Sequence, residues 1–215
     1  MLIRNVPFIG DKKEEYGACQ GPPTTMMALR FFRPKVKISF PELYKKMGYE
    51  KGKWFFESYV VELLSSYGIP CIYYSDEDVK PIGNDKQRFN SVTGLEFNKR
   101  NEQNVDTKHY DSSLSYALKN GLFKKQRIDL DFIIENIKNR KLIIAIVNRN
   151  ELSGGDGFRG HFTLIRGFEK DNLICNDSYF GENVWIEFKD FKNAFYAIDW
   201  GDRQKRKTHH IIVLG

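Results

Sequence analysis

Apolar residues have helical spacing in most of the first half of the chain and form short runs in the second half. This spacing, together with proline, capping and glycine signals, predicts helices over 23–32, 39–48, 54–68, 113–121 and 129–141. Runs rich in branched and aromatic residues predict strands over 69–75, 142–148, 161–168, 172–177, 184–188 and 209–215. The run "LIIAIVN" at 142–148 has no polar face until its last residue, which is typical of a strand buried on both sides.

Helices that precede strands in this way indicate an α+β fold. A chain of 215 residues can form one core or two small lobes around a cleft. We expect a single domain over 1–215, with a helical lobe over about 1–140, a β lobe over about 141–215 and a site between them. The polar segment 86–112 is predicted to be a loop that could act as a lid.

The stretch "ACQGPPTTMMALRFF" at 18–32 places a cysteine before a helix. A residue that precedes proline avoids the helical region, so Pro22 is expected outside the helix and Pro23 at its start. Cys19 would then lie about one turn before the helix and receive less of the helix dipole.

Charge and composition exclude several classes of function. The net charge is +6, but basic and acidic residues are interleaved except in "RQKRK" at 203–207, so nucleic acid is not a predicted partner. No apolar run approaches the about 20 residues of a membrane helix, and the first residues do not form a signal peptide. We therefore expect no membrane association and a cytoplasmic location.

The cysteines and most of the histidines do not form a metal or cofactor site. Cys71 and Cys175 lie inside apolar runs and are expected in the core. His109 is expected to be exposed in the charged loop, and His209 and His210 should face opposite sides of a strand. No metal and no cofactor is predicted.

Three residues distant in sequence have the types that thiol catalysis requires. Cys19 precedes a helix, His161 opens a strand after the loop "SGGDGFRG", and Asp177 ends the next strand. A hairpin with its turn near Glu169 would return Asp177 toward His161. A thiol nucleophile needs a base within hydrogen-bond reach and a third group that orients the base. The glycine-rich loop is expected to be flexible and to form a rim of the cleft.

The segments "NVPF", "CQGPPTTMMALRFF" and "GHFTLIRGFEKDNLICNDSYFG" resemble those of the bacteriocin-leader-peptidase branch of papain-like cysteine peptidases. The resemblance extends over about the whole chain. It implies a papain-like fold with Cys19 as nucleophile, His161 as general base and Asp177 as orienting acid. Asn176 is the alternative orienter, because papain-like enzymes can use asparagine, although adjacent strand residues face opposite ways.

The sequence departs from that family pattern around the cysteine. Gln20 stands between Cys19 and the Gly-Pro pair, and no glutamine precedes the cysteine as an oxyanion donor. Gln20 and Lys13 are the secondary candidates for that role, and loss of one oxyanion donor typically lowers turnover by about 100- to 1,000-fold.

Three functions remain open from the sequence. The leading one is a cysteine peptidase or amide hydrolase that acts on a peptide or amide substrate through a thioester. The alternatives on the same fold are a catalytically silent binding module and a transpeptidase, in which an amine takes the acyl group. The sequence does not decide the oligomeric state.

Overall fold

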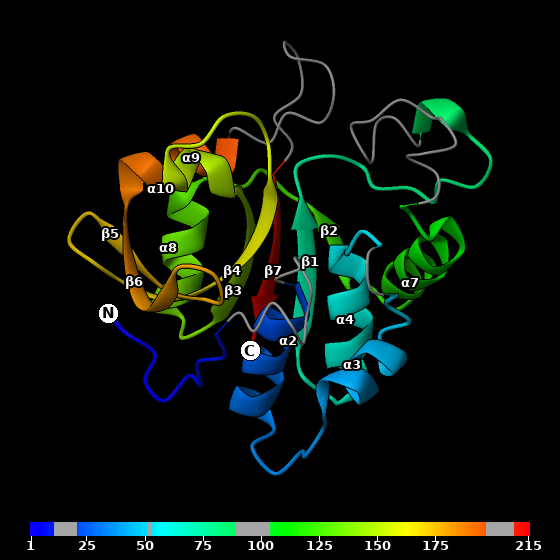
Figure 1. Cartoon of the computed structure of the whole chain (residues 1–215), viewed down its shortest axis with the longest axis horizontal. Helices are drawn as coiled ribbons and strands as arrows, with labels where there is room; N and C mark the ends of the chain where they lie inside the picture. Colours follow the sequence, from blue (N-terminus) through cyan, green and yellow to red (C-terminus); the bar gives the residue numbers. More distant parts are fainter. Residues whose placement is uncertain (11–20, 51–52, 89–103, 197–208) are drawn as a thin grey trace.

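A single sheet runs through the centre of the computed structural model, which describes residues 1–10, 21–50, 53–88, 104–196 and 209–215. In this described part the sheet has seven strands in the order β2-β1-β7-β3-β4-β5-β6 (Figure 1). Its strands are β1 (Cys71–Ser75), β2 (Phe123–Lys125), β3 (Leu142–Asn148), β4 (Gly160–Glu169), β5 (Asn172–Asp177), β6 (Gly181–Glu187) and β7 (His210–Leu214). β1 and β2 are parallel, and the other neighbours are antiparallel.

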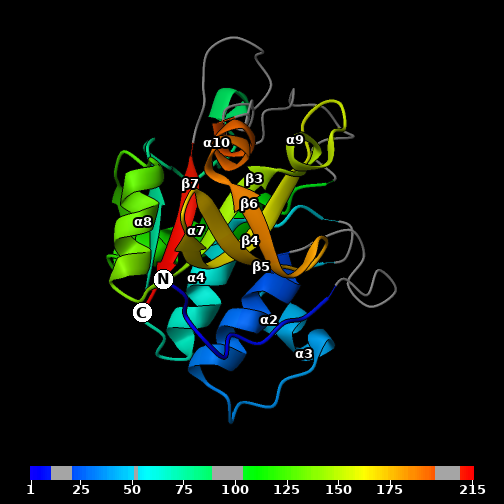
Figure 2. The ribbon, with the colours of Figure 1, turned by 90° about the vertical axis from the view of Figure 1, so that its left-hand side faces the viewer.

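Helices cover both faces of the sheet (Figures 1 and 2). The helices of the described residues are α2 (Gly21–Phe32), α3 (Phe40–Lys46), α4 (Glu57–Ser66), α7 (Thr107–Lys119), α8 (Leu130–Lys138), α9 (Arg149–Ser153) and α10 (Phe188–Tyr196). α2 packs on β4 and α4 packs on β1 and β7, whereas α8 and α10 both pack on β3. No helix in these ranges is long and apolar enough to cross a bilayer.

Strand β3 separates two apolar cores. Leu142, Ile144 and Ile146 belong to the core formed with α2 and α4, and the alternate residues of the strand belong to the core formed with α8 and α10. All seven residues of β3 are buried. The prediction of a strand buried on both faces is therefore confirmed, because only a continuous apolar run can fill two cores at once.

The α+β class is confirmed, but the two halves of the chain are less segregated than predicted. β1 and β2 come from before residue 140 and join the same sheet as the later strands, and α9 and α10 lie among those later strands. β2, α9 and α10 are absent from the sequence-based prediction. β2 and α9 are short and have few apolar residues, and α10, which is richer in aromatic residues, packs on β3. The lobe boundary itself stays a prediction.

The expected loop over 86–112 is wrong at its end. Thr107 begins α7, and the carboxylate of Asp106 caps this helix by accepting a hydrogen bond from the backbone N–H of His109 at 2.9 Å. His109 is half-buried rather than exposed, since its ring packs on Tyr59 and its Nε2 contacts the carbonyl oxygen of Met47. Residues 89–103, the middle of the segment expected to act as a lid, lie outside the described residues.

Helix α2 begins earlier than predicted. Gly21 and Pro22 are both helical, so the expectation that the helix starts at Pro23 is wrong. The steric bias against helix before proline is moderate, and the fixed φ of proline suits a first turn. Both residues are buried, and the hydroxyl of Thr25 donates a hydrogen bond to the carbonyl oxygen of Gly21 at 2.8 Å. Cys19 is thus only two positions before the helix in sequence.

The start of α2 lies against an aromatic ring. A Cβ atom built on Gly21 would be 2.1 Å from the ring of Phe55, which in turn packs edge-to-face on Phe162 of β4 with 5.3 Å between ring centroids. Only glycine allows this close approach of helix, ring and strand.

We predict that Gly21→Ala destabilises the fold by about 1–3 kcal/mol, because the added methyl group must displace Phe55. Urea unfolding measures this change. Gly10→Ala is the matched control, since a Cβ there meets its nearest atom, on Phe8, at 3.4 Å. Equal stabilities of the two variants would contradict the close contact.

A carboxyl group is buried where α4 meets β1 and β7. Glu57 is 7% exposed, and its Oε1 lies 3.6 Å from Nδ1 of His210, which also contacts the hydroxyl of Tyr73 at 2.5 Å. Burial raises the pKa of Glu57 to about 7 and lowers the pKa of His210 to about 4, so both shifts favour neutral groups. His209 pairs instead with Asp76, which confirms that the two histidines have different surroundings.

We predict that Glu57→Gln gains stability relative to the natural chain as the pH rises. The folded protein holds the Glu57 proton to a pKa of about 7, against 4.5 for an unperturbed glutamate carboxyl group. The protonated carboxyl group therefore contributes to the stability of the natural chain at low pH, and this contribution disappears as the pH rises from 4.5 through about 7. The amide of Glu57→Gln has no proton to lose, so the stability of that variant does not change in this way. The difference should change by about 2–3 kcal/mol between about pH 4 and pH 8.

Urea unfolding of both chains at the two pH values measures this change. Glu62→Gln, on the same helix but less buried, controls for the loss of a negative charge. A Glu57→Gln difference that is independent of pH would show that the carboxyl is not held neutral.

Candidate active site

His161 is the second residue of β4 and lies near one end of the strand. Gly160 pairs with Asn148 at the end of β3, and His161 pairs with the next residue inward, Val147. The imidazole is buried, with only 1% of the residue exposed. Strand pairing fixes the backbone of His161, and its place near the end of β4 puts the imidazole close to the end of the sheet.

Asp177 returns to His161 as the hairpin between β4 and β5 predicts. Nε2 of His161 lies 2.7 Å from Oδ2 of Asp177, and both side chains are inaccessible to solvent. Leu164 pairs with Asn176, so continuing that register places Asp177 opposite Thr163. His161 is two residues further on the same face and reaches the carboxylate diagonally. The turn is therefore centred slightly after Glu169.

The carboxylate of Asp177 accepts hydrogen bonds on both oxygens. Oδ1 accepts from the backbone N–H groups of Tyr179 and Phe180 at 2.9 and 3.0 Å. Burial alone would raise the pKa of Asp177, but the hydrogen bond and charge of His161 and the two N–H groups outweigh it and hold the pKa below its usual value. An ionised acceptor requires that Nε2 of His161 carries the proton.

This tautomer leaves Nδ1 of the neutral imidazole as an acceptor. Nδ1 is buried, and no residue in the described ranges hydrogen-bonds to it. A buried imidazole nitrogen normally has a partner, so the site is arranged to receive one more proton donor.

Two aromatic rings border the imidazole. Tyr179 and Phe180 stand edge-to-face against His161, with centroid distances of 6.2 and 5.9 Å. They are the second and third residues after Asp177, in the turn that its carboxylate fixes. The sequence segment "NDSYFG" contains them, but only the turn geometry shows that they flank the histidine.

Asn176 does not contact His161, so the alternative orienter is wrong. Its Nδ2 donates to the carbonyl oxygens of Val6 and Pro7 at 3.1 and 3.4 Å, and its Oδ1 accepts from Arg166 at 3.3 Å. Adjacent strand residues face opposite sides, and Asn176 therefore holds the N-terminal segment while Asp177 faces the histidine.

The start of α2 contacts the residue after His161. The hydroxyl of Thr24 donates to the carbonyl oxygen of Phe162 at 3.2 Å. Phe162 and His161 point to opposite faces of β4, so a group preceding α2 must approach the imidazole around the end of the strand. Cys19, Gln20 and Lys13 lie outside the described residues, as does "RQKRK".

The two described cysteines are core residues, as predicted. Cys71 is 4% exposed and Cys175 is fully buried. Burial raises the pKa of Cys71 to about 12 and raises that of Cys175 as well. Neither thiol is therefore a thiolate near neutral pH. The described residues contain no group of three or more side chains that could hold a metal ion.

The loop before His161 is held by several hydrogen bonds, and its expected flexibility stays a prediction. The side-chain amide of Asn148 donates to Gly157 and its Oδ1 accepts from the backbone N–H of Arg159, at 3.1 and 2.8 Å. Asn150 donates to the carbonyl oxygen of Asp156 at 2.6 Å. Asn148 was not recognised as a site residue, since a strand-end asparagine has no distinctive sequence signal.

Comparison with solved structures finds proteins of similar fold. A C39-like peptidase from Bacillus anthracis superposes with a TM-score of 0.53 and 11% identity, covering 100% of this chain and 96% of that one. The fold is that of a papain-like, C39-like peptidase. The peptidase domain of Streptococcus ComA, a bifunctional ABC transporter in a quorum-sensing pathway, is also similar, with a TM-score of 0.48, 9% identity and 98% coverage of each chain. No family model and no curated protein matches the sequence.

The papain-like fold explains why His161 and Asp177 sit on neighbouring strands of one sheet. The strand pairing fixes their backbones, and the diagonal contact needs no loop to adjust. A site built on strands is held more precisely than one built on loops.

We predict that Asp177→Asn destabilises the chain near neutral pH and that the loss becomes smaller in acid. The folded-state pKa of Asp177 lies below 3.8, so its stabilisation is present above that value and disappears as the pH falls through the lowered pKa. Urea midpoints at about pH 6 and pH 3 measure the change.

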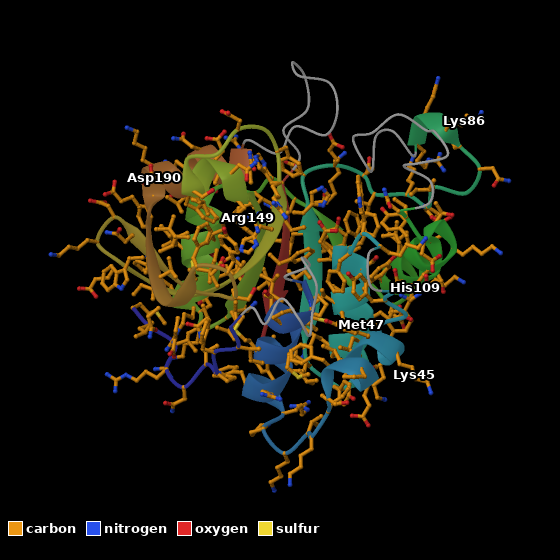
Figure 3. All side chains as sticks on the ribbon, in the orientation of Figure 1. Lys45, Met47, Lys86, His109, Arg149 and Asp190 are labelled. Carbon is orange, nitrogen blue, oxygen red and sulfur yellow. The ribbon has the colours of Figure 1, made fainter. Side chains whose placement is uncertain are left out.

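Asp190→Asn is the matched control, because Asp190 is exposed on α10 (Figure 3). It should leave the unfolding midpoint nearly unchanged at about pH 6. A loss for Asp177→Asn that stays constant down to acid pH would contradict an ionised, hydrogen-bonded carboxylate.

Proposed function

We propose that the protein is a thiol-dependent amide hydrolase, with a peptide as its substrate. Cys19 would be the nucleophile, His161 the general base and Asp177 the orienting acid. The observation that carries the proposal is the buried His161–Asp177 pair. Nδ1 of His161 has no hydrogen-bond partner among the described residues, so it can accept a proton from a thiol.

The proposed position of Cys19 follows from α2. The cysteine is two residues before Gly21, and the first turn of α2 touches β4 next to His161. The N-terminal end of a helix carries a partial positive charge that favours a thiolate, and a histidine partner lowers the thiol pKa further. The earlier start of α2 supports this argument, because Gly21, the first described helical residue, is closer to Cys19 in sequence than Pro23, where the helix was expected to start.

The reaction would proceed by acyl transfer. Nδ1 of His161 takes the thiol proton, and the thiolate sulfur attacks the amide carbon to give a tetrahedral oxyanion. The C–N bond then breaks, and the leaving amine takes the proton from the imidazolium. Water, with its proton passed to Nδ1, attacks the thioester and releases the acid and the thiol. Asp177 would keep Nε2 protonated, so that Nδ1 remains the base.

The oxyanion would need donors near Cys19. The backbone N–H of Cys19 is one candidate, and Gln20 or Lys13 is a second. The fold relationship to a C39-like peptidase supports a peptide substrate by analogy.

We predict that iodoacetamide at about pH 6 modifies Cys19 and neither of the other cysteines. Peptide mapping by mass spectrometry measures the site. Cys71 and Cys175 should not react in the folded protein, because burial raises their pKa values. Cys19→Ala should abolish labelling, and His161→Gln should slow it at least about tenfold, since the thiol then loses its base.

Labelling of Cys71 or Cys175 in the folded chain would refute the assignment of Cys19. A Cys19 that reacts no faster than free cysteine, with the same rate in His161→Gln, would favour the silent binding module. Products that retain an added amine would identify the transpeptidase.

A further inference from the structure

Arg149 is a buried cation beside the His161–Asp177 pair. It follows Asn148, whose strand partner is Gly160, the residue before His161. The strand pairing therefore brings Arg149 and His161 to the same end of the sheet. Only 7% of Arg149 is exposed, and Figure 3 labels its position in the structure.

The guanidinium lies on the ring of Tyr179. Its central carbon is 4.2 Å from the ring centroid, a distance typical of a cation–π contact. The same ring stands at 74° to the imidazole of His161 and packs on Phe180 at 5.0 Å. Tyr179 is nevertheless 42% exposed, so its position over the histidine depends on these few contacts.

The backbone of α9 holds Arg149 in place. Its N–H donates to the carbonyl oxygen of Arg159 at 2.8 Å, and Asn148 caps the helix and fastens the loop that follows. The backbone of Arg149 is thus fixed by the sheet and the loop, whereas the Tyr179 ring that its guanidinium contacts is partly exposed.

We propose that Arg149 is a positioning residue that holds the Tyr179 ring over the His161–Asp177 pair and keeps water from the Nε2–H···Oδ2 hydrogen bond. The effect of Arg149 on turnover rests on the proposed function, but its effect on the His161–Asp177 hydrogen bond does not. A hydrogen bond to a charged carboxylate is stronger when water is excluded, so the tautomer of His161 is better defined under the ring.

The test measures the exchange of the His161 Nε2 proton with water in the full chain. A buried imidazole N–H gives a downfield proton NMR signal, and His161→Gln assigns it by its loss. Arg149→Met keeps an unbranched, flexible side chain but removes the guanidinium and its charge, and it should increase exchange about tenfold, with Arg149→Lys in between. Tyr179→Leu should give an increase like that of Arg149→Met.

The double variant decides whether Arg149 acts through the ring. In the Tyr179→Leu background, Arg149→Met should add no further increase. Exchange in Arg149→Met within about twofold of the natural chain, or two independent increases in the double variant, would overturn the proposal. Thermal unfolding checks each fold, and if Arg149→Met does not fold, the same cycle is run with Arg149→Lys.

Activity provides the second readout. If the chain is a peptidase, Arg149→Met should alter the pH profile of kcat/KM and Arg149→Lys should partly restore it. An inactive natural chain whose Nε2 proton still exchanges faster in Arg149→Met would refute the proposed function and support this inference.

Discussion

The hydrogen bond between His161 and Asp177 depends on the pairing of β4 and β5, and the site depends on that bond. Two side chains without solvent contact share one proton position, and the ionised carboxylate assigns that proton to Nε2. The remaining nitrogen is then a base. The same carboxylate fixes the turn that carries Tyr179 and Phe180, so one acid orients the imidazole and places the rings that border it.

The sheet gives these interactions their rigidity. β3 contributes side chains to a core on each of its faces. β4 pairs with β3, and His161 is the second residue of β4. Moving the histidine would require moving a strand packed on both sides. Two asparagines near this end are hydrogen-bonded as well, since Asn148 holds the loop before His161 and Asn176 holds the N-terminal segment. A weakly exposed site on such a frame can keep its geometry without a ligand.

Local patterns in the sequence predicted many of the elements. The apolar run of β3 and the capping box of Ser39 and Glu42 both have the predicted structure, because a strand buried on two faces and a capped helix leave strong local signals. α9 and α10 were missed, since their apolar positions acquire meaning only beside β3. The helical state of Pro22 was mispredicted because a local proline bias yielded to packing against Phe55.

The sequence by itself determined the α+β class, the core positions of Cys71 and Cys175, and two candidate partners for His161 at the end of the next strand. Tertiary structure alone decided between Asn176 and Asp177, because the strand register and the pleat determine which of two neighbours faces the ring. It also brought Arg149 onto Tyr179 from a different strand end. Such contacts depend on the distance between backbones far apart in sequence, which no local pattern encodes.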